Sequence, residues 1–163
     1  MVSGLIRDAM IEIVEFVRKT IDMINDKQVS EMIDVLIDAY NRDARILVMG
    51  AGRTGLVGRG FAMRLLHLGY RVAILGDTIV PRIREKDIVI ALSGSGRTKL
   101  IVTAAEAAKA VGAYVIALTS FPDSPLAQLA DTIVVIPGRT KIAREEDYFT
   151  RQILGIHEPL APL

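Results

Sequence analysis

Five short apolar runs constrain the fold of this chain more than any other feature. The runs are RILVMG (45–50), RVAILG (71–76), DIVIALSG (87–94), AYVIALT (113–119) and TIVVIPG (132–138). Each run is almost continuously hydrophobic instead of alternating with polar residues. That pattern is typical of a strand buried on both faces of a parallel sheet. We therefore predict five parallel strands.

Segments with helical periodicity lie before and between these runs. We predict helices over 5–24, 28–40, 54–69, 98–111 and 124–130. Ser124 or Asp123 can cap the last helix, with Pro125 in its first turn. Two helices followed by alternating strands and helices predict an α/β fold, a doubly wound five-stranded parallel sheet with helices on both faces and N-terminal helices.

Composition excludes several classes of protein. The 163 residues are enough for one domain, and no apolar run approaches the roughly 20 residues that a membrane span needs. The hydrophobic fraction of 51% therefore indicates doubly buried strands or subunit interfaces. Twenty basic against nineteen acidic residues, with no basic tract, predict neither a nucleic-acid nor a membrane partner. The absence of cysteine excludes disulfides and thiolate metal sites.

Two glycine-rich stretches follow the first and third runs. They are GAGRTG (50–55) and LSGSGRTKL (92–100). In a doubly wound sheet, ligands bind beyond the carboxyl ends of the strands, near the point where the strand order reverses. Both stretches are expected at that edge, so they are the candidate ligand-binding loops.

The second loop has the composition of a phosphate-binding turn. Its glycines, Gly96 among them, let backbone N–H groups approach an anion, and the start of the following helix adds favourable partial charge. The hydroxyls of Ser93, Ser95 and Thr98 can donate further hydrogen bonds. The lysine of a nucleoside triphosphate P-loop is missing, because Arg97 takes its place. A tight turn without a ligand is the competing interpretation.

The first loop matches the dinucleotide fingerprint G-x-G-x-x-G. Asp77, after the next strand, stands where a ribose-binding carboxylate would be expected. Two observations oppose a dehydrogenase: the chain has no catalytic domain outside the sheet, and the glycine-rich turn is repeated after the third strand. The fingerprint alone is compatible with three interpretations: a dinucleotide site, a second wall of a phosphate site, or a simple tight turn.

Together these stretches resemble a known family. GAGRTG with AMRLLHLG, VIALSGSGRT and SPLAQLAD is similar to the SIS (sugar isomerase) family, which binds phosphosugars. The resemblance runs from about residue 30 to the end and implies a flavodoxin-like sheet. Within the family it is strongest to the 6-phospho-3-hexuloisomerases, and arabinose-5-phosphate isomerases share both loops. It implies a cytoplasmic protein whose partners are a small-molecule sugar phosphate and further copies of itself, as a homodimer or homotetramer.

The resemblance implies conversion of 3-hexulose 6-phosphate into fructose 6-phosphate through an enediol, with no metal and no organic cofactor. It assigns the phosphate to Ser93, Ser95, Gly96 and Thr98. It assigns the sugar to the first loop, through Gly50, Gly52, Arg53 and Thr54. Thr54 replaces the family's usual serine and keeps the hydroxyl.

The family's catalytic glutamate has no counterpart in these residues. It follows a P-[ML]-G-[ST]-x-[FA]-E stretch, and this sequence reaches Pro162 and Leu163 where that stretch begins. Glu158 precedes the motif and does not take over the role. We expect one SIS domain over 1–163 without the C-terminal catalytic helix. Either the natural chain continues, which we favour because a missing packing helix would uncover apolar surface, or the protein only binds.

Two histidines are further candidates for proton transfer. His67, near the end of a predicted helix, is either a hydrogen-bonded helix-end residue or a donor in a neighbouring subunit's active site. His157 lies in the irregular tail, and 145–147 are expected to be a solvated acidic face. The competing function is a non-catalytic phosphosugar-binding module, like the SIS domains of some transcription regulators.

Overall fold

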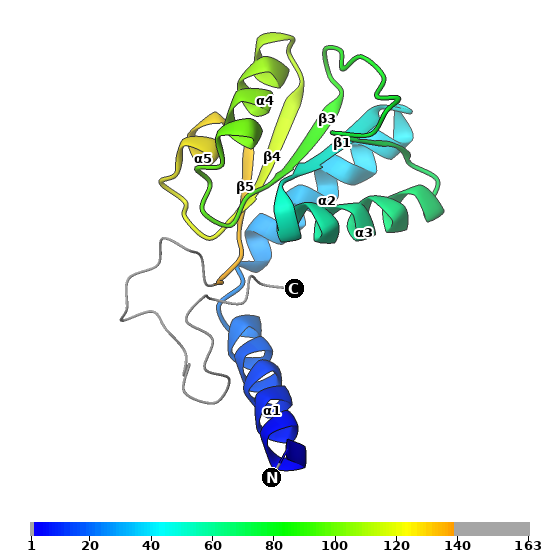
Figure 1. The fold of residues 1–163 in the computed structure, drawn as a ribbon. Helices are drawn as coiled ribbons and strands as arrows, with labels where there is room; N and C mark the ends of the chain where they lie inside the picture. The colour runs from blue at the N-terminus through cyan, green and yellow to red at the C-terminus, as the bar shows by residue number, and fades with distance from the viewer. Residues whose placement is uncertain (1, 139–163) are drawn as a thin grey trace.

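A five-stranded parallel sheet lies at the centre of the computed structural model, which describes residues 2–138 (Figure 1). The strands are β1 (Arg45–Gly50), β2 (Arg71–Ile74), β3 (Ile88–Leu92), β4 (Tyr114–Thr119) and β5 (Thr132–Val135). Their order is β2-β1-β3-β4-β5, and every pair is parallel. This is the flavodoxin-like order, so the predicted doubly wound sheet is confirmed.

Five helices accompany the sheet. They are α1 (Val2–Ile21), α2 (Asp26–Asn41), α3 (Gly52–His67), α4 (Lys99–Ala110) and α5 (Pro125–Leu129). All five predicted helices are present, with ends that differ by one to three residues. The predicted cap of the short helix is confirmed, because the Ser124 side chain accepts a hydrogen bond from the backbone N–H of Ala127 at 3.4 Å.

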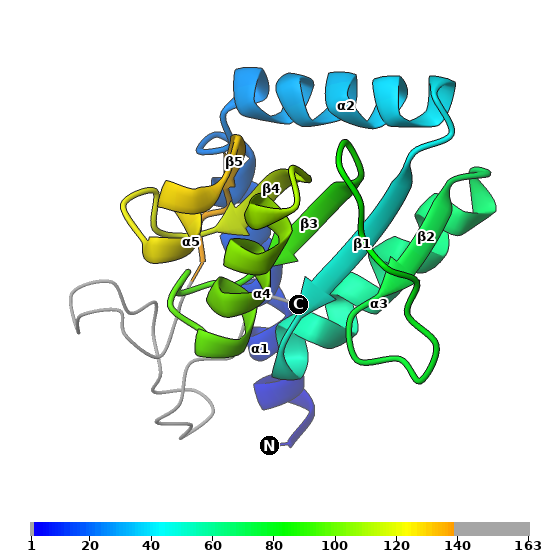
Figure 2. The ribbon, with the colours of Figure 1, turned by 90° about the horizontal axis from the view of Figure 1, so that it is seen from above.

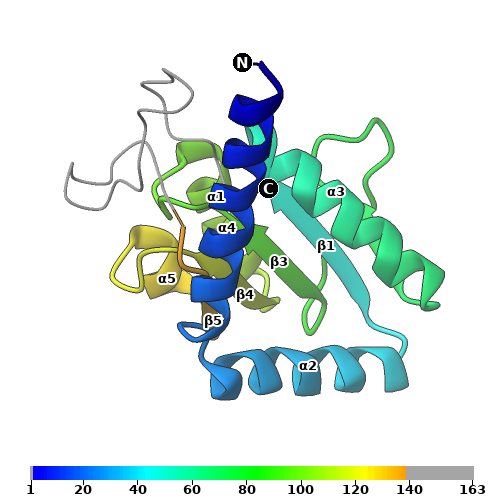
Figure 3. The same cartoon turned by 90° about the horizontal axis from the view of Figure 1, so that it is seen from below.

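The helices cover the two faces of the sheet in separate layers (Figures 2 and 3). Alternate strand residues point to opposite faces. Ile46, Val48 and Ile90 therefore pack with α2 and α3 in one core. Leu47, Met49 and Val89 pack with α4 and α5 in the other. Burial on both faces accounts for the unbroken hydrophobicity of the runs.

The connection from β2 to β3 contains no helix, as the sequence predicted. Instead, Val80 and Ile83 of this segment pack against the core beneath α4 and α5. Four strands are shorter than their apolar runs. For β2 the run ends at Gly76, whose φ of +97° is incompatible with extended strand geometry.

Helix α1 projects away from the rest of the domain (Figure 1). Its apolar side chains are exposed, unlike those on the inner faces of α3 and α4. Within residues 2–138, the structure has no helix that is long and apolar enough to cross a membrane. The predicted acidic face at 145–147 lies outside the described residues.

Candidate phosphate-binding site

Both glycine-rich loops lie at the edge where the strand order reverses. The strands β1 and β3 are neighbours, and Gly50 at the end of β1 is in register with Leu92 at the end of β3. The chain leaves β1 towards β2 on one side and leaves β3 towards β4 on the other. The loops therefore flank the position where doubly wound folds bind ligands.

Neighbouring elements hold the second loop by its carbonyl groups. The carbonyl oxygen of Gly94 accepts hydrogen bonds from the backbone N–H of Ser120 (3.0 Å) and from Thr119 Oγ1 (3.3 Å). The carbonyl oxygen of Gly96 accepts one from the N–H of Leu126 (3.0 Å). The acceptors of this turn are thus satisfied by β4 and α5 before any ligand arrives.

The donors of the same loop remain available. In the described part of the chain, the backbone N–H groups of Ser95, Thr98 and Lys99 have no hydrogen-bond acceptor. Thr98 is the N-cap of α4, and its side chain makes no capping hydrogen bond. A turn with occupied carbonyls and available N–H groups at the start of a 12-residue helix favours an anion.

Two of the three loop hydroxyls are hydrogen-bonded to each other. Ser93 Oγ and Thr98 Oγ1 lie 3.0 Å apart, and Ser93 is only 3% exposed. One hydroxyl proton joins the two oxygens, which leaves the other for a further acceptor. Ser95 Oγ accepts the N–H of Arg97 at 3.2 Å and keeps its own proton to donate. The structure thus brings together the three predicted hydroxyl donors.

Gly96 has a packing role that the sequence did not reveal. Its φ is +60°, in the left-handed region. A Cβ at this position would overlap with Oγ and Cβ of Ser124, the residue that caps α5. Gly96 therefore allows α5 to dock directly against the loop. Its predicted contact with a ligand stays a prediction.

The first loop is shaped by a close approach of its two outer glycines. A Cβ on Gly55 would lie 2.7 Å from the carbonyl oxygen of Gly50, so the start of α3 can touch the end of β1 only without side chains there. Gly52 has φ +57° and open space around it. Gly52 and Arg53 are exposed, and Thr54 is half-buried. Four predicted sugar-side residues therefore lie on one turn.

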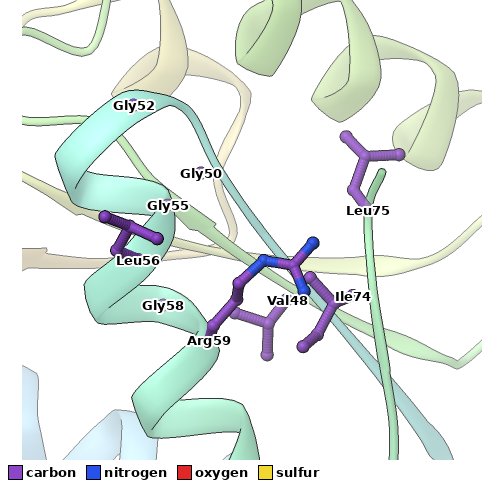
Figure 4. Close-up of a pocket in the computed structure, with 9 residues that line it drawn as sticks. All are labelled: Val48, Gly50, Gly52, Gly55, Leu56, Gly58, Arg59, Ile74 and Leu75. Carbon is purple, nitrogen blue, oxygen red and sulfur yellow. The ribbon is translucent and has the colours of Figure 1, made fainter. Parts of the chain in front are cut away.

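A cavity of about 180 Å³ adjoins this first loop (Figure 4). It is lined by Val48, Gly50, Gly52, Gly55, Leu56, Gly58, Arg59, Ile74 and Leu75. It lies between α3 and the ends of β1 and β2, on the side away from the second loop, so we do not equate it with the phosphate site. Arg59 Nη2 is 2.6 Å from Asp77 Oδ1. The carboxylate that a dinucleotide ribose would require is already paired, which argues against the dehydrogenase interpretation.

The structure separates His67 from both loops. Gly52 is the first and His67 the last residue of α3, and 16 helical residues span about 24 Å. His67 is exposed at the far edge of the sheet. Within one chain it does not meet the phosphate loop. The other predicted or weighed candidates, His157 and Glu158, lie outside the described residues.

The fold and the loop together define a doubly wound α/β domain with a candidate anion-binding turn at its switch point. The SIS domain family matches residues 40–152, so the chain belongs to the SIS family. An uncharacterized protein of Aeropyrum pernix is 59% identical over 94% of this chain and 73% of its own length. The 3-hexulose-6-phosphate isomerase of Mycobacterium gastri is 45% identical over 77% of this chain and 62% of its own length.

Solved structures show the same relationship. A Methanococcus jannaschii protein, whose crystal structure infers a molecular function of 3-hexulose-6-phosphate isomerase, has a TM-score of 0.63 at 31% identity, over 75% of this chain and 67% of its own. An E. coli CFT073 protein in complex with arabinose 5-phosphate has a TM-score of 0.73 at 26% identity, over 83% of this chain and 73% of its own. The Vibrio vulnificus NanR protein complexed with ManNAc-6P has a TM-score of 0.67 at 26% identity, over 80% of this chain and 50% of its own.

Proposed function

We propose that this protein is a phosphosugar isomerase that converts 3-hexulose 6-phosphate into fructose 6-phosphate. The observation that carries the proposal is the loop after β3, with occupied carbonyls, available N–H groups and three hydroxyls. The relatives named 3-hexulose-6-phosphate isomerase support the choice of substrate. A hexulose phosphate presents a dianion at one end, which such a loop suits.

The reaction moves a carbonyl by one carbon. A base removes the proton from C2 of the 3-hexulose while O3 takes up a proton, which forms a 2,3-enediol. A proton is then delivered to C3 while the hydroxyl proton leaves O2, so the carbonyl is now at C2. Binding the remote phosphate holds C2 and C3 in place for these transfers. Donors near O2 and O3 stabilise the charge that develops there.

The two loops divide the substrate between them. In this proposal the phosphate lies against Ser93, Ser95, Gly96 and Thr98. The first loop, through Gly50, Gly52, Arg53 and Thr54, lines the sugar. The register of β1 and β3 supports the division, because it sets the two loops side by side. The general base is not assigned to a described residue.

His67 can act only in a second copy of the chain. Its place at the opposite end of α3 from Gly52 excludes a direct role in its own site. We propose that it donates a hydrogen bond to a sugar oxygen in the site of a partner subunit. Mixing a His67→Asn chain with a Thr98→Val chain tests this. Complementation restores activity in mixed assemblies only if the two residues serve one site from different chains.

The proposed activity is tested on the full natural chain with 3-hexulose 6-phosphate as substrate. The formation of fructose 6-phosphate is measured with coupling enzymes that convert and then oxidise this product. We expect turnover of this substrate, and we expect Thr98→Val to lower it at least tenfold. Saturable binding of fructose 6-phosphate without turnover would reject the isomerase and support the binding module instead. Absence of both would reject the phosphate site as well.

Arabinose 5-phosphate is the second candidate substrate. It is supported by the likeness to the E. coli CFT073 protein that was solved in complex with this sugar phosphate. A parallel assay that follows ribulose 5-phosphate formation decides between the two, because isomerisation of a five-carbon sugar phosphate gives a five-carbon ketose and no fructose 6-phosphate. Faster turnover of arabinose 5-phosphate than of the hexulose would replace the proposed substrate.

A further inference from the structure

Helix α1 exposes an apolar surface that the other elements within residues 2–138 leave uncovered. At about 100° per residue, seven exposed apolar side chains occupy roughly half of the circumference of α1. They are Leu5, Ile6, Met10, Ile13, Val14, Val17 and Ile21. Their exposed fractions lie between 43% and 67%. The apolar stripe by which a helix contacts a single partner helix is narrower than this face. Such a wide face suits a helix that packs against two neighbours at once.

Helix α3 exposes a second apolar surface, on the side opposite its core contacts. Leu56, Gly60 and Met63 follow one another at intervals of four and three residues, and we call them the α3 stripe. Leu56 is 69% and Met63 53% exposed. The helical layer on the other face of the sheet shows few such residues, namely Leu100 and Val111.

The charges beside these two surfaces are complementary. Asp8, Glu12 and Glu15 lie at helical spacing along one edge of the apolar face of α1, while the three basic residues of the helix lie in its last turn or on the opposite edge. Helix α3 contains three arginines and no acidic residue. Arg64 lies beside the α3 stripe and, among the described residues, has no ion-pair partner. An acidic helix edge and a basic one attract each other across an interface.

The two surfaces lie apart in the described part of the chain. The C-terminal end of α1 lies near the β5 edge of the sheet. Gln28, at the start of the following helix α2, accepts a hydrogen bond from the backbone N–H of Val135 through Oε1 at 3.0 Å. Helix α3 covers β1 and β2. From β5 to β2 there are four strand spacings, about 19 Å in total. Helix α1 points away from the domain instead of folding back across it (Figure 1).

We infer that α1 of one copy packs on the α3 stripe of a second copy, and that the exchange is reciprocal. An isologous pair of this kind buries both apolar surfaces twice and places Asp8 and Glu15 near Arg64 of the other chain. Two α1 and two α3 helices then form one four-helix cluster. The inference does not depend on the isomerase reaction, since it concerns only assembly.

Sedimentation and light scattering on the full chain provide the first test. We expect a dimer or a higher assembly at micromolar concentration. The double variant Asp8→Arg/Glu15→Arg and the single variant Arg64→Glu should each raise the dissociation constant at least tenfold. Their combination should recover most of the affinity, because the charges are then exchanged. Glu106→Arg, on the exposed side of α4, is the matched control and should change nothing.

The second test uses the absence of cysteine from the sequence. Chains carrying Met10→Cys, Val14→Cys or Val17→Cys are each mixed with a Met63→Cys chain and oxidised. At least one mixture should give a cross-linked pair of the two different chains, while mixtures with Leu100→Cys should not. A monomeric protein, an assembly without any such cross-link, or charge reversals that the combination does not repair would overturn the inference. A monomer would instead point to another cover for α1, such as residues 139–163.

Discussion

The two glycine-rich loops lie on adjacent strands but are built in different ways. The loop after β3 is held from outside, by hydrogen bonds from β4 and α5 to its carbonyl groups. The loop after β1 is held from inside, by direct contact between Gly50 and Gly55. The first arrangement fixes backbone donors for an anion. The second brings a helix close to a strand and leaves Gly52 and Arg53 exposed. Similar composition therefore supports an anchor in one loop and an adaptable wall in the other.

The largest effect is expected from Gly96→Ala. The new Cβ would be placed against Ser124 in a left-handed backbone, and the overlap adds to the strain. We expect the free energy of unfolding to fall by about 3 kcal/mol or more. Gly52→Ala is the matched control, since it has nearly the same φ but open space. It should cost about 1 kcal/mol. Equal losses in denaturant titrations would show that the contact with Ser124 is unimportant.

Gly55→Ala should have the next largest effect. Alanine favours a helix over glycine by about 1 kcal/mol, but here its Cβ would press on the carbonyl oxygen of Gly50. We expect a net loss of about 1–2 kcal/mol in unfolding free energy. Gly60→Ala lies in the same helix with nothing within 4 Å and should stabilise by about 0.5–1 kcal/mol. The close approach would be refuted if both variants were stabilised.

The hydroxyl pair of the second loop should affect binding more than folding. Thr98→Val keeps the shape and removes the partner of Ser93, so we expect affinity for fructose 6-phosphate to fall about tenfold, near 1.4 kcal/mol. Thr98→Ser should bind almost normally. Calorimetric titration of Ser93→Ala, Thr98→Val and the double variant gives a cycle. Strictly additive losses would mean that the two hydroxyls act separately.

The smallest effect is expected from Arg59→Gln, beside the first loop. The ion pair with Asp77 is 46% and 41% exposed, so water screens it. The free energy of unfolding should change by about 0.5 kcal/mol or less, and fructose 6-phosphate affinity should stay the same. A large loss of affinity would mean that the substrate extends into the cavity under α3, which would make the two walls of the site more alike than we propose.

Local patterns predicted the elements well, and the contacts between them poorly. Hydrophobic runs and helical spacing gave all five strands and five helices, because both signals depend on neighbouring residues. The cap at Ser124 was predicted for the same reason. The docking of Ser124 on Gly96 was not, since it joins residues 28 positions apart. The role of His67 illustrates the same limit. The length of α3 would already have placed it far from the loop, but nothing in its surroundings shows which chain it serves.

The dependence of the second loop on β4 and α5 has a thermodynamic consequence. Leu126 and Ser120 hold the turn, so the proposed phosphate cradle exists only while residues 114–129 are folded against it. A ligand that binds the intact cradle is then linked to the folding of this half of the sheet, and by mass action raises the midpoint of thermal unfolding. Inorganic phosphate alone would act as a folding ligand of the carboxyl-terminal half of the domain, whether or not any sugar is turned over.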